Sequence, residues 1–181
     1  ETTYNENVSD FQKIKFRQRV AIDMSNRTLE TKMINQPVSM PVAIAPTGLT
    51  GMQRADGEIL AAQAAEEFGI PYTLSTMSVC SIEAVAEKTK KPFWFQLYVM
   101  KDKKFMERLI DRAKEAKCSA LVLTLDLQLL GQRHKDLRNG LSTPPKLIPK
   151  HIYQVLTRPM WCLRMLTTKN HFFGNIVGHV Q

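Results

Sequence analysis

A glutamine lies at the centre of an otherwise apolar and aromatic stretch, "FWFQLYV", which spans residues 93–99. The composition and length of this stretch predict a buried β-strand. Side chains alternate between the two faces of a strand, so Gln96 shares its face with Trp94 and Tyr98. A buried amide without hydrogen-bond partners costs about 1–3 kcal/mol. Gln96 therefore either pairs with other polar groups in the interior or faces a ligand, and this strand alone does not decide between the two.

Polar side chains also stand at the C-terminal ends of three other predicted strands. These strands are "SMPVAIAP", "IPYTLS" and "SALVLTLD". The polar residues at or just beyond their ends are Thr47, Ser75, Thr124 and Asp126. Both α/β barrels and open α/β sheets build their sites at the edge where parallel strands end. A site at this edge explains Gln96 better than chance does.

Helices are predicted between these strands, at residues 55–69, 81–92 and 102–117. The residues that begin them are suited to N-caps: Asp56, Ser81 and Asp102. The first helix ends at a glycine, Gly69, and the last carries one apolar stripe, formed by Phe105, Leu109, Ala113 and Ala116. Strands that alternate with helices in this way predict a parallel sheet with right-handed crossovers.

Two architectures fit this alternation: an open doubly wound sheet, or part of an eight-stranded α/β barrel. An open sheet would usually carry a glycine-rich phosphate loop after its first strand. The sequence there is "APTGLTGMQRADGE", which matches neither G-x-G-x-x-G nor a Walker loop. The barrel is therefore favoured, although the alternation by itself is compatible with both.

The last third of the chain is basic and breaks the pattern. The net charge is +8, and all four histidines lie here, at positions 134, 151, 171 and 179. Residues 132–150 predict a long polar loop that is mobile or functional. Residues 151–166, "HIYQVLTRPMWCLRML", predict a helix interrupted at Pro159. Its Trp and Met residues suit membrane contact, but packing against the rest of the protein is the favoured interpretation. No nucleic-acid-binding motif accompanies the basic charge.

Composition sets further limits. The chain has 181 residues, enough for one domain with a sizeable core. It has no apolar run long enough for a membrane span and no signal peptide pattern, and it begins at Glu1, which suggests a processed product or a fragment. The three cysteines are odd in number and lack metal-ligand spacing, so we expect reduced thiols, an intracellular setting and no metal site.

Several stretches together resemble the family of FMN-dependent α-hydroxy acid dehydrogenases and oxidases, which includes L-lactate dehydrogenase and glycolate oxidase. They are "FQKIKFRQRV", "PVAIAPTGLTGM", "GEILAAQAAEEFGIPYTLST", "FWFQLYV" and "LVLTLDLQLLGQRHKDLRNG". They cover nearly the whole chain in the family's order. "GQRHKDLRNG" and "WCLRML" look most like the bacterial L-lactate dehydrogenase branch.

The resemblance implies an eight-stranded (β/α)8 barrel with FMN at its C-terminal mouth. Residues 1–181 would form the N-terminal half of this single domain: a lead-in at 1–40, the first four strands with their helices at 41–126, and a long loop and helix at 127–181. The "APTG" backbone would pass along the flavin's central edge. The residues implied to bind the cofactor are Ala45, Pro46, Thr47, Gly48, Ser75, Gln96 and Thr124.

Three further roles follow from the same resemblance. Tyr98 would meet the substrate hydroxyl or carboxylate, Arg133 would help to hold the carboxylate, and Asp126 would pair with the catalytic histidine. That histidine belongs to a His-Gly-Arg motif that this sequence lacks. The family's N-terminal substrate-site tyrosine and late phosphate-binding loops are also missing, and Met77 stands where several oxidases carry a tryptophan.

The expected function is therefore FMN-dependent oxidation of a 2-hydroxy acid, with L-lactate the expected substrate and pyruvate the product, in the intact protein. Residues 1–181 alone are expected to be inactive. The alternatives are another FMN barrel, such as an isomerase, or a non-catalytic basic binding module. A quinone, a cytochrome and oxygen all remain candidate electron acceptors. We expect a homo-oligomer, a tetramer, that is cytoplasmic or peripheral on the inner membrane and does not bind nucleic acid.

Overall fold

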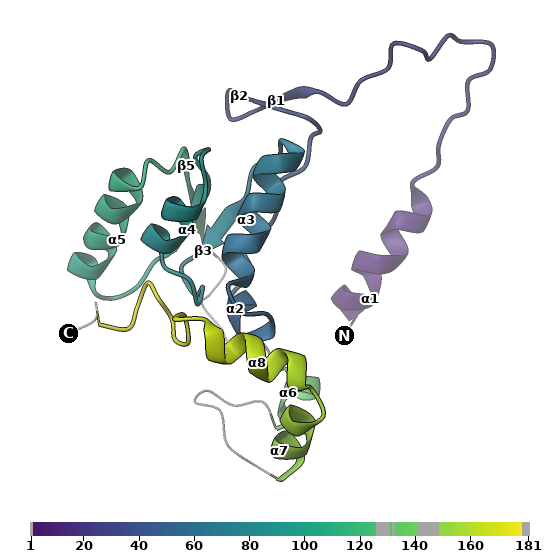
Figure 1. The fold of residues 1–181 in the computed structure, drawn as a ribbon. Helices are drawn as coiled ribbons and strands as arrows, with labels where there is room; N and C mark the ends of the chain where they lie inside the picture. Colours follow the sequence, from purple (N-terminus) through teal and green to yellow (C-terminus); the bar gives the residue numbers. More distant parts are fainter. Residues whose placement is uncertain (1, 126–130, 132, 141–148, 179–181) are drawn as a thin grey trace.

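A computed structural model describes residues 2–125, 131, 133–140 and 149–178 (Figure 1). The helices are α1 (Thr2–Ser9), the short 3-10 helix η1 (Asp10–Lys13), α2 (Thr50–Gln53), α3 (Gly57–Phe68), α4 (Ile82–Lys88), α5 (Lys103–Glu115), α6 (His134–Arg138), α7 (Pro149–Leu156) and α8 (Pro159–Thr167). The strands are β1 (Thr31–Met33), β2 (Gln36–Val38), β3 (Thr73–Ser75), β4 (Trp94–Tyr98) and β5 (Ala120–Thr124).

The predicted alternation of strand and helix is confirmed from β3 onward. β3, β4 and β5 form one parallel sheet in sequence order, with Ser75 paired to Gln96 and Tyr98 to Thr124. The first predicted strand, residues 39–46, is not a regular strand within the described chain. It is reduced to a parallel bridge between Ile44 and Tyr72, because Met40 and Val42 form a tight turn before it. The bridge still places the end of this stretch beside β3.

The core lies between the sheet and the helices α3, α4 and α5, which Figure 1 shows over the same face of the sheet. Phe95 and Leu97 of β4 point into it, and Phe105 and Leu109 of α5 meet them from the helix side. The expected α5 stripe is thus confirmed, and it explains why the face of β4 that carries Gln96 must point the other way.

Two of the three predicted N-caps form as expected. The Ser81 side chain accepts a hydrogen bond from the Ala84 N–H, and the Asp102 side chain accepts one from the Phe105 N–H. Gly69 ends α3 in the left-handed conformation, also as expected.

Asp56 precedes α3 but makes no side-chain capping bond, so its predicted role as a cap is wrong. Its Oδ1 instead accepts hydrogen bonds from Thr168 Oγ1 and Asn170 Nδ2, both at 2.7 Å. Asp56 has a φ of 55°, and its carboxylate is used to hold the segment after α8. A contact more than 100 residues away in sequence replaces the local one.

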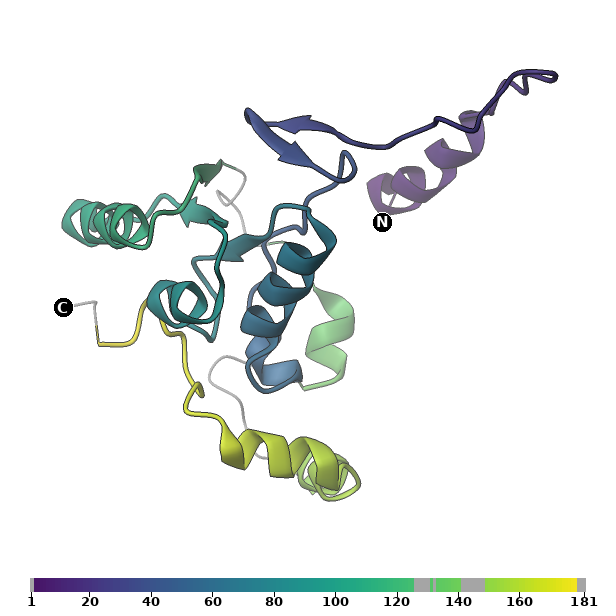
Figure 2. The same cartoon turned by 45° about the horizontal axis from the view of Figure 1, so that its top comes forward.

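The N-terminal arm, residues 2–30, is exposed along its whole length and carries α1 away from the sheet in both views (Figures 1 and 2). It leads into the β1–β2 hairpin, which the sequence analysis missed. Ile34 and Asn35 both have positive φ at its two-residue turn, as a type I′ turn requires. The turn lacks the usual glycine, and this is why the pattern was not recognised.

The interruption at Pro159 is confirmed: α7 ends at Leu156, and Pro159 is the first residue of α8. The stretch 132–150 was expected to be a loop, but part of it is helical, since α6 closes with a hydrogen bond from the Leu137 N–H to the Arg133 carbonyl. Residues 132 and 141–148 of that stretch lie outside the described chain.

Candidate functional site

The carboxamide of Gln96 joins the ends of three neighbouring strands. Its Oε1 accepts hydrogen bonds from Ser75 Oγ at 3.3 Å and from the Thr76 N–H at 3.2 Å. Its Nε2 donates to Thr124 Oγ1 at 2.8 Å. Gln96 is 1% exposed, so these partners replace hydrogen bonds to water that the amide loses on burial. The structure therefore brings together Ser75, Gln96 and Thr124, three residues that the sequence had placed at strand ends.

The chemistry of the partners fixes the orientation of this amide. A backbone N–H can only donate, so the atom that faces Thr76 must be Oε1, and Nε2 must face Thr124. The Nε2 group carries two hydrogens, and Thr124 accepts one of them. Among the described residues, no acceptor is found for the second amide hydrogen or for the Thr124 hydroxyl hydrogen. Each of these two groups therefore keeps one hydrogen that no described residue accepts.

The turn after β3 holds this network in place. The Met77 N–H donates to Ser75 Oγ at 3.1 Å, which leaves the Ser75 hydroxyl hydrogen to Gln96. The Ser78 N–H closes the turn onto the Ser75 carbonyl at 3.1 Å. Ser75 and Ser78 are both buried. The position of the Gln96 amide therefore depends on the geometry of residues 75–78.

The "APTG" loop, Ala45, Pro46, Thr47 and Gly48, lies exposed beside this turn. The Leu49 N–H donates to the Met77 carbonyl at 3.1 Å. A Cβ on Gly48 would lie 3.3 Å from the Met77 Cβ, a tight contact, so a glycine allows the two loops to approach closely. The exposed backbone of this loop is therefore adjacent to the turn that holds Ser75.

The three residues expected to act on the substrate differ in their burial and in whether the structure describes them. Tyr98 is half-buried and lies two residues beyond Gln96 on the same face of β4. Arg133 is exposed at the start of α6 and makes no ion pair within the described chain. Asp126 lies outside the described residues.

Glu58 is a buried charged residue near this edge that sequence reasoning missed. It is 0% exposed, and its Oε1 accepts from the Val79 N–H at 3.0 Å, while Oε2 has no partner among the described residues. Burial raises the pKa of the Cys80 thiol, and the Glu58 carboxylate raises it further. Glu58 shares the buried stripe of α3 with Ala62 and Ala65, and that spacing could have identified it.

Asn175 is a second missed residue. It is fully buried, and its side chain bonds to Ser75, Ser78 and Ile82. No local pattern around "FFGNI" indicates this, because its side-chain partners, which include Arg112, lie between 63 and 100 residues earlier in the chain.

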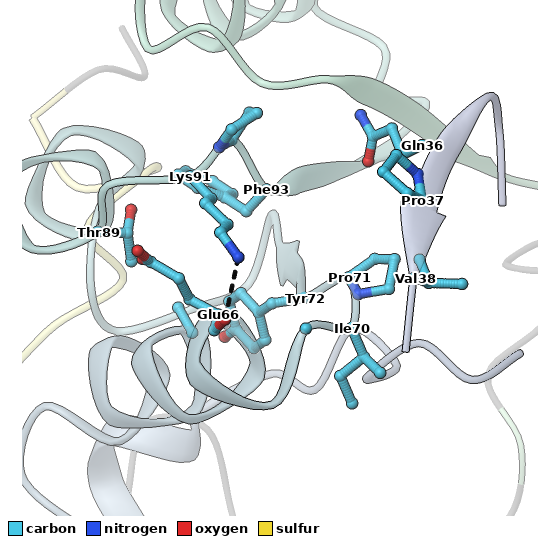
Figure 3. Close-up of a pocket in the computed structure, with 13 residues that line it drawn as sticks. Gln36, Pro37, Val38, Glu66, Ile70, Pro71, Tyr72, Thr89, Lys91 and Phe93 are labelled. Carbon is cyan, nitrogen blue, oxygen red and sulfur yellow. Dashed lines mark hydrogen bonds between the residues drawn. The ribbon is translucent and has the colours of Figure 1, made fainter. Parts of the chain in front are cut away.

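A cavity of about 290 Å³ lies at the opposite end of the strands (Figure 3). Tyr72 and Phe93, which precede β3 and β4, line it together with the hairpin residues Gln36 and Val38. Figure 3 shows Lys91 reaching the backbone oxygen of Glu66, at 3.5 Å. This end of an α/β barrel serves stability, so we do not assign the site here. Within the described chain, no group of three or more His, Cys, Asp or Glu side chains could hold a metal ion.

Comparison with known proteins places this geometry in context. A family model described as FMN-dependent dehydrogenase matches residues 1–180. The L-lactate dehydrogenase of Acinetobacter baylyi is 46% identical over 177 residues, which are 97% of this chain and 46% of that protein.

Solved structures agree. A crystal structure of the monotopic membrane protein (S)-mandelate dehydrogenase matches with a TM-score of 0.85 and 32% identity, covering 93% of this chain and 45% of that one. A structure of a mandelate oxidase variant with (S)-mandelic acid matches with a TM-score of 0.71 and 32% identity, over 76% of this chain and 41% of that one. The chain thus spans less than half the length of these relatives.

Proposed function

The chain belongs to the FMN-dependent dehydrogenase family, and from this premise we propose that the native protein oxidises a small 2-hydroxy acid, with L-lactate as the preferred substrate. By native protein we mean this chain with any further residues that its gene encodes. The fold is part of the family's (β/α)8 barrel, and the cofactor of the family is FMN. The observation that carries the proposal is the Gln96 amide, buried among strand ends with a donor left over.

The residues at the strand ends fit the polar end of a flavin. The pyrimidine half of an isoalloxazine ring presents two carbonyl oxygens, which need hydrogen-bond donors. The second amide hydrogen of Gln96 and the hydroxyl hydrogen of Thr124 are such donors, on neighbouring strands whose side chains lie 2.8 Å apart. Thr47 and Gly48 are exposed, and Gly48 lies against Met77 in the turn that follows Ser75, so the backbone of this loop could border a flat ring bound there. Gln96, Thr124 and Ser75 would hold this end of FMN.

The reaction requires few groups from this half of the barrel. When bound, FMN supplies the acceptor for the hydride equivalent that leaves the hydroxyl carbon. Tyr98, half-buried two residues beyond Gln96, would bind the substrate hydroxyl or carboxylate beside the ring. Arg133 would contribute to carboxylate binding, and Asp126 would stabilise a protonated histidine. The four histidines of this sequence are not followed by glycine, so that histidine would come from another part of the native protein.

L-lactate is proposed over larger acids because the relative at 46% identity is an L-lactate dehydrogenase, while the mandelate enzymes are 32–36% identical. The test measures kcat/KM of the native protein for L-lactate, D-lactate, glycolate and (S)-mandelate with an artificial electron acceptor, and identifies the released flavin. We expect a yellow protein with FMN and highest kcat/KM for L-lactate. A colourless folded protein that takes up no FMN would refute the proposal, and (S)-mandelate as the best substrate would refute the lactate assignment.

The helices α7 and α8 support a second proposal, contact with an anionic membrane surface. Several of their apolar side chains are exposed: Ile152, Tyr153, Leu156, Met160, Leu163 and Leu166. Arg158 and Arg164 lie among them. Exposed apolar groups interleaved with cations suit the interface of an anionic bilayer. One structural relative is described as a monotopic membrane protein.

No helix in the described part of the chain is long and apolar enough to cross a membrane.

The remaining expectations stay proposals. We propose a cytoplasmic location, peripheral on the inner membrane, in keeping with the proposed membrane contact, and assembly of the native protein into a homotetramer. We also retain the division into lead-in, first four strands, and long loop with helix. Assays with a quinone analogue, cytochrome c and oxygen would identify the electron acceptor.

A further inference from the structure

The segment after α8 reaches back to the candidate flavin site through one side chain. Asn175 lies in the sequence "FFGNI" and is fully buried. Its Oδ1 accepts from the Ile82 N–H at 2.9 Å and from Arg112 at 3.4 Å. Its Nδ2 donates to Ser78 Oγ at 2.9 Å and to the Ser75 carbonyl at 3.4 Å. The side chain thus uses both its acceptor sites and both its donor hydrogens.

The orientation of this amide is also fixed by chemistry. The Ile82 N–H can only donate, so Oδ1 faces α4 and Nδ2 faces the turn at residues 75–78. The two ends of the amide therefore contact different elements. The oxygen accepts from the first N–H of α4, and the nitrogen donates to the turn.

The backbone next to Asn175 approaches the same turn. The Gly174 N–H lies 3.2 Å from both the Ser78 and the Val79 carbonyl. A Cβ at Gly174 would lie 2.6 Å from the Val79 oxygen and 2.7 Å from the Ser81 nitrogen. These distances are too short for any side chain, so only glycine fits at this position. The Arg112 guanidinium donates to the Asn175 carbonyl at 3.3 Å and ties the segment to α5. Residues 174 and 175 therefore pack tightly against elements that are far away in the sequence.

The turn that Asn175 holds carries the partners of Gln96. Ser75 Oγ and the Thr76 N–H both donate to Gln96 Oε1, and Nε2 of that amide then faces Thr124. A shift of the turn would move both donors and release the amide. The chain of contacts runs from Asn175 through the turn to Gln96.

We propose that Asn175 is a positioning residue of the flavin site, which sets FMN affinity by fixing the turn at residues 75–78 that orients the Gln96 amide. This inference rests on the proposed function. Asn175 itself need not contact the flavin. It acts from a segment 100 residues away from Ser75 in the sequence, so the segment after α8 helps to build the site as well as to carry α8.

The decisive variant is Asn175→Asp in the native protein. The carboxylate keeps the acceptors for Ile82 and Arg112 but has no hydrogens to donate to Ser75 and Ser78. We expect the Kd of the apoprotein for FMN, measured from the quenching of flavin fluorescence, to rise about tenfold, equivalent to about 1.4 kcal/mol. The melting temperature of the apoprotein should also fall, because a buried carboxylate oxygen then faces the Ser75 carbonyl, so the Kd is measured well below the melting temperature of the variant.

Three further variants make the result interpretable. Asn170→Ala is the matched control, because it removes a 2.7 Å contact of the same segment to Asp56 and touches nothing in the turn, so its Kd for FMN should stay at the wild-type value. Ser78→Ala removes the hydroxyl that Nδ2 contacts, together with the hydrogen bond of that hydroxyl to the Cys80 carbonyl, and should raise the Kd about threefold, a smaller effect because the Nδ2 contact to Ser75 remains. Gln96→Ala tests the flavin site itself.

The outcomes separate the two proposals. If Gln96→Ala binds FMN as tightly as wild type, the proposed flavin site is wrong. If Gln96→Ala weakens FMN binding but Asn175→Asp does not, only the role of Asn175 is overturned. Equal weakening by Asn170→Ala would also overturn it, because docking of the whole segment would then be responsible. Should Asn175→Asp not fold, wild-type affinity in Ser78→Ala overturns the proposal, and a raised Kd supports it.

Discussion

Gln96 and Thr124 lie 28 residues apart in the sequence, and Nε2 of the one donates to Oγ1 of the other at 2.8 Å across the β4–β5 pair. Thr124 stands opposite Tyr98 in the register, so the contact reaches diagonally along the strands. A ligand at the end of these strands would meet an amide held on both sides, whose position is set before binding. Prior fixing of a binding group lowers the entropic cost of binding.

Neighbours on one strand should separate cofactor binding from turnover. Gln96→Ala should raise the Kd for FMN about tenfold or more, because at least one hydrogen bond to the ring is lost and the buried Ser75 hydroxyl loses its acceptor. Tyr98→Phe should keep FMN bound and lower kcat about tenfold, the change expected for one hydrogen bond in the transition state. Flavin titration and steady-state kinetics give the two values. The reverse pattern would exchange the two roles.

The Glu83–Arg112 ion pair should make the free energy of unfolding depend on pH in the acidic range. The hydrogen bond from Arg112 lowers the pKa of Glu83 from 4.5 to about 2. A lowered carboxylate pKa stabilises the fold above the unfolded-state pKa and loses this effect as pH falls towards the folded-state pKa. Glu83→Gln should therefore cost about 0.2–1 kcal/mol at pH 7, a small value because the Glu83 side chain is more than half exposed.

The difference in unfolding free energy between wild type and Glu83→Gln should shrink between pH 4.5 and pH 2. Urea unfolding at pH 7, 4.5 and 3 measures it. A difference that stays constant over this range would show that the ion pair does not cause it.

The core under the sheet should be sensitive to cavities. Leu109 is 0% exposed at the centre of the α5 stripe, so Leu109→Ala should destabilise the native protein by about 2–5 kcal/mol. Leu137→Ala makes the same chemical change at a side chain that is 69% exposed and should cost less than about 0.5 kcal/mol. Urea unfolding of both variants checks the comparison. Equal losses would contradict the assignment of the core to α5 and β4.

The exposed face of α8 should govern membrane binding. The double variant Leu163→Glu, Leu166→Glu places charges at side chains that are 62% and 83% exposed and should abolish binding to phosphatidylserine-containing vesicles. The control Phe68→Glu changes an exposed apolar residue at the end of α3 and should bind as wild type does. Co-sedimentation at low and high salt measures both the apolar and the electrostatic part. Undiminished binding of the double variant would place the contact elsewhere.

Residues 1–181 alone should not oxidise L-lactate. No histidine in this sequence belongs to a His-Gly-Arg motif, so the general base that the family resemblance implies is lacking. Leu121 and Leu123 of β5 are about half exposed, and the outer edge of β5 pairs with no strand in the described chain. Such an edge invites association with other chains.

The measurement is turnover of residues 1–181 with excess FMN and an artificial acceptor, together with size-exclusion chromatography. We expect no turnover above that of free FMN, and associated species. Activity that Tyr98→Phe abolishes would show that this part of the chain carries a complete site.

The sequence alone determined the alternation of strands and helices, because period, caps and apolar stripes are local. The Ser81 and Asp102 caps, the α5 stripe and the polar residues at the strand ends all follow from neighbours within a few positions. It also identified the family, since several motifs occur together in one order. The β1–β2 hairpin escaped because its Ile34–Asn35 turn reaches positive φ without glycine.

Only the tertiary structure decided which of these groups meet. Asp56 had the right type and position for an N-cap, yet its carboxylate is used by Thr168 and Asn170. Gln96 could have paired in the interior or faced a ligand, and three strands had to be brought into register before its Nε2 could reach Thr124. Asn175 carried no local signal at all. Hydrogen bonds over such separations depend on chain closure, which the spacing of residues in the sequence does not encode.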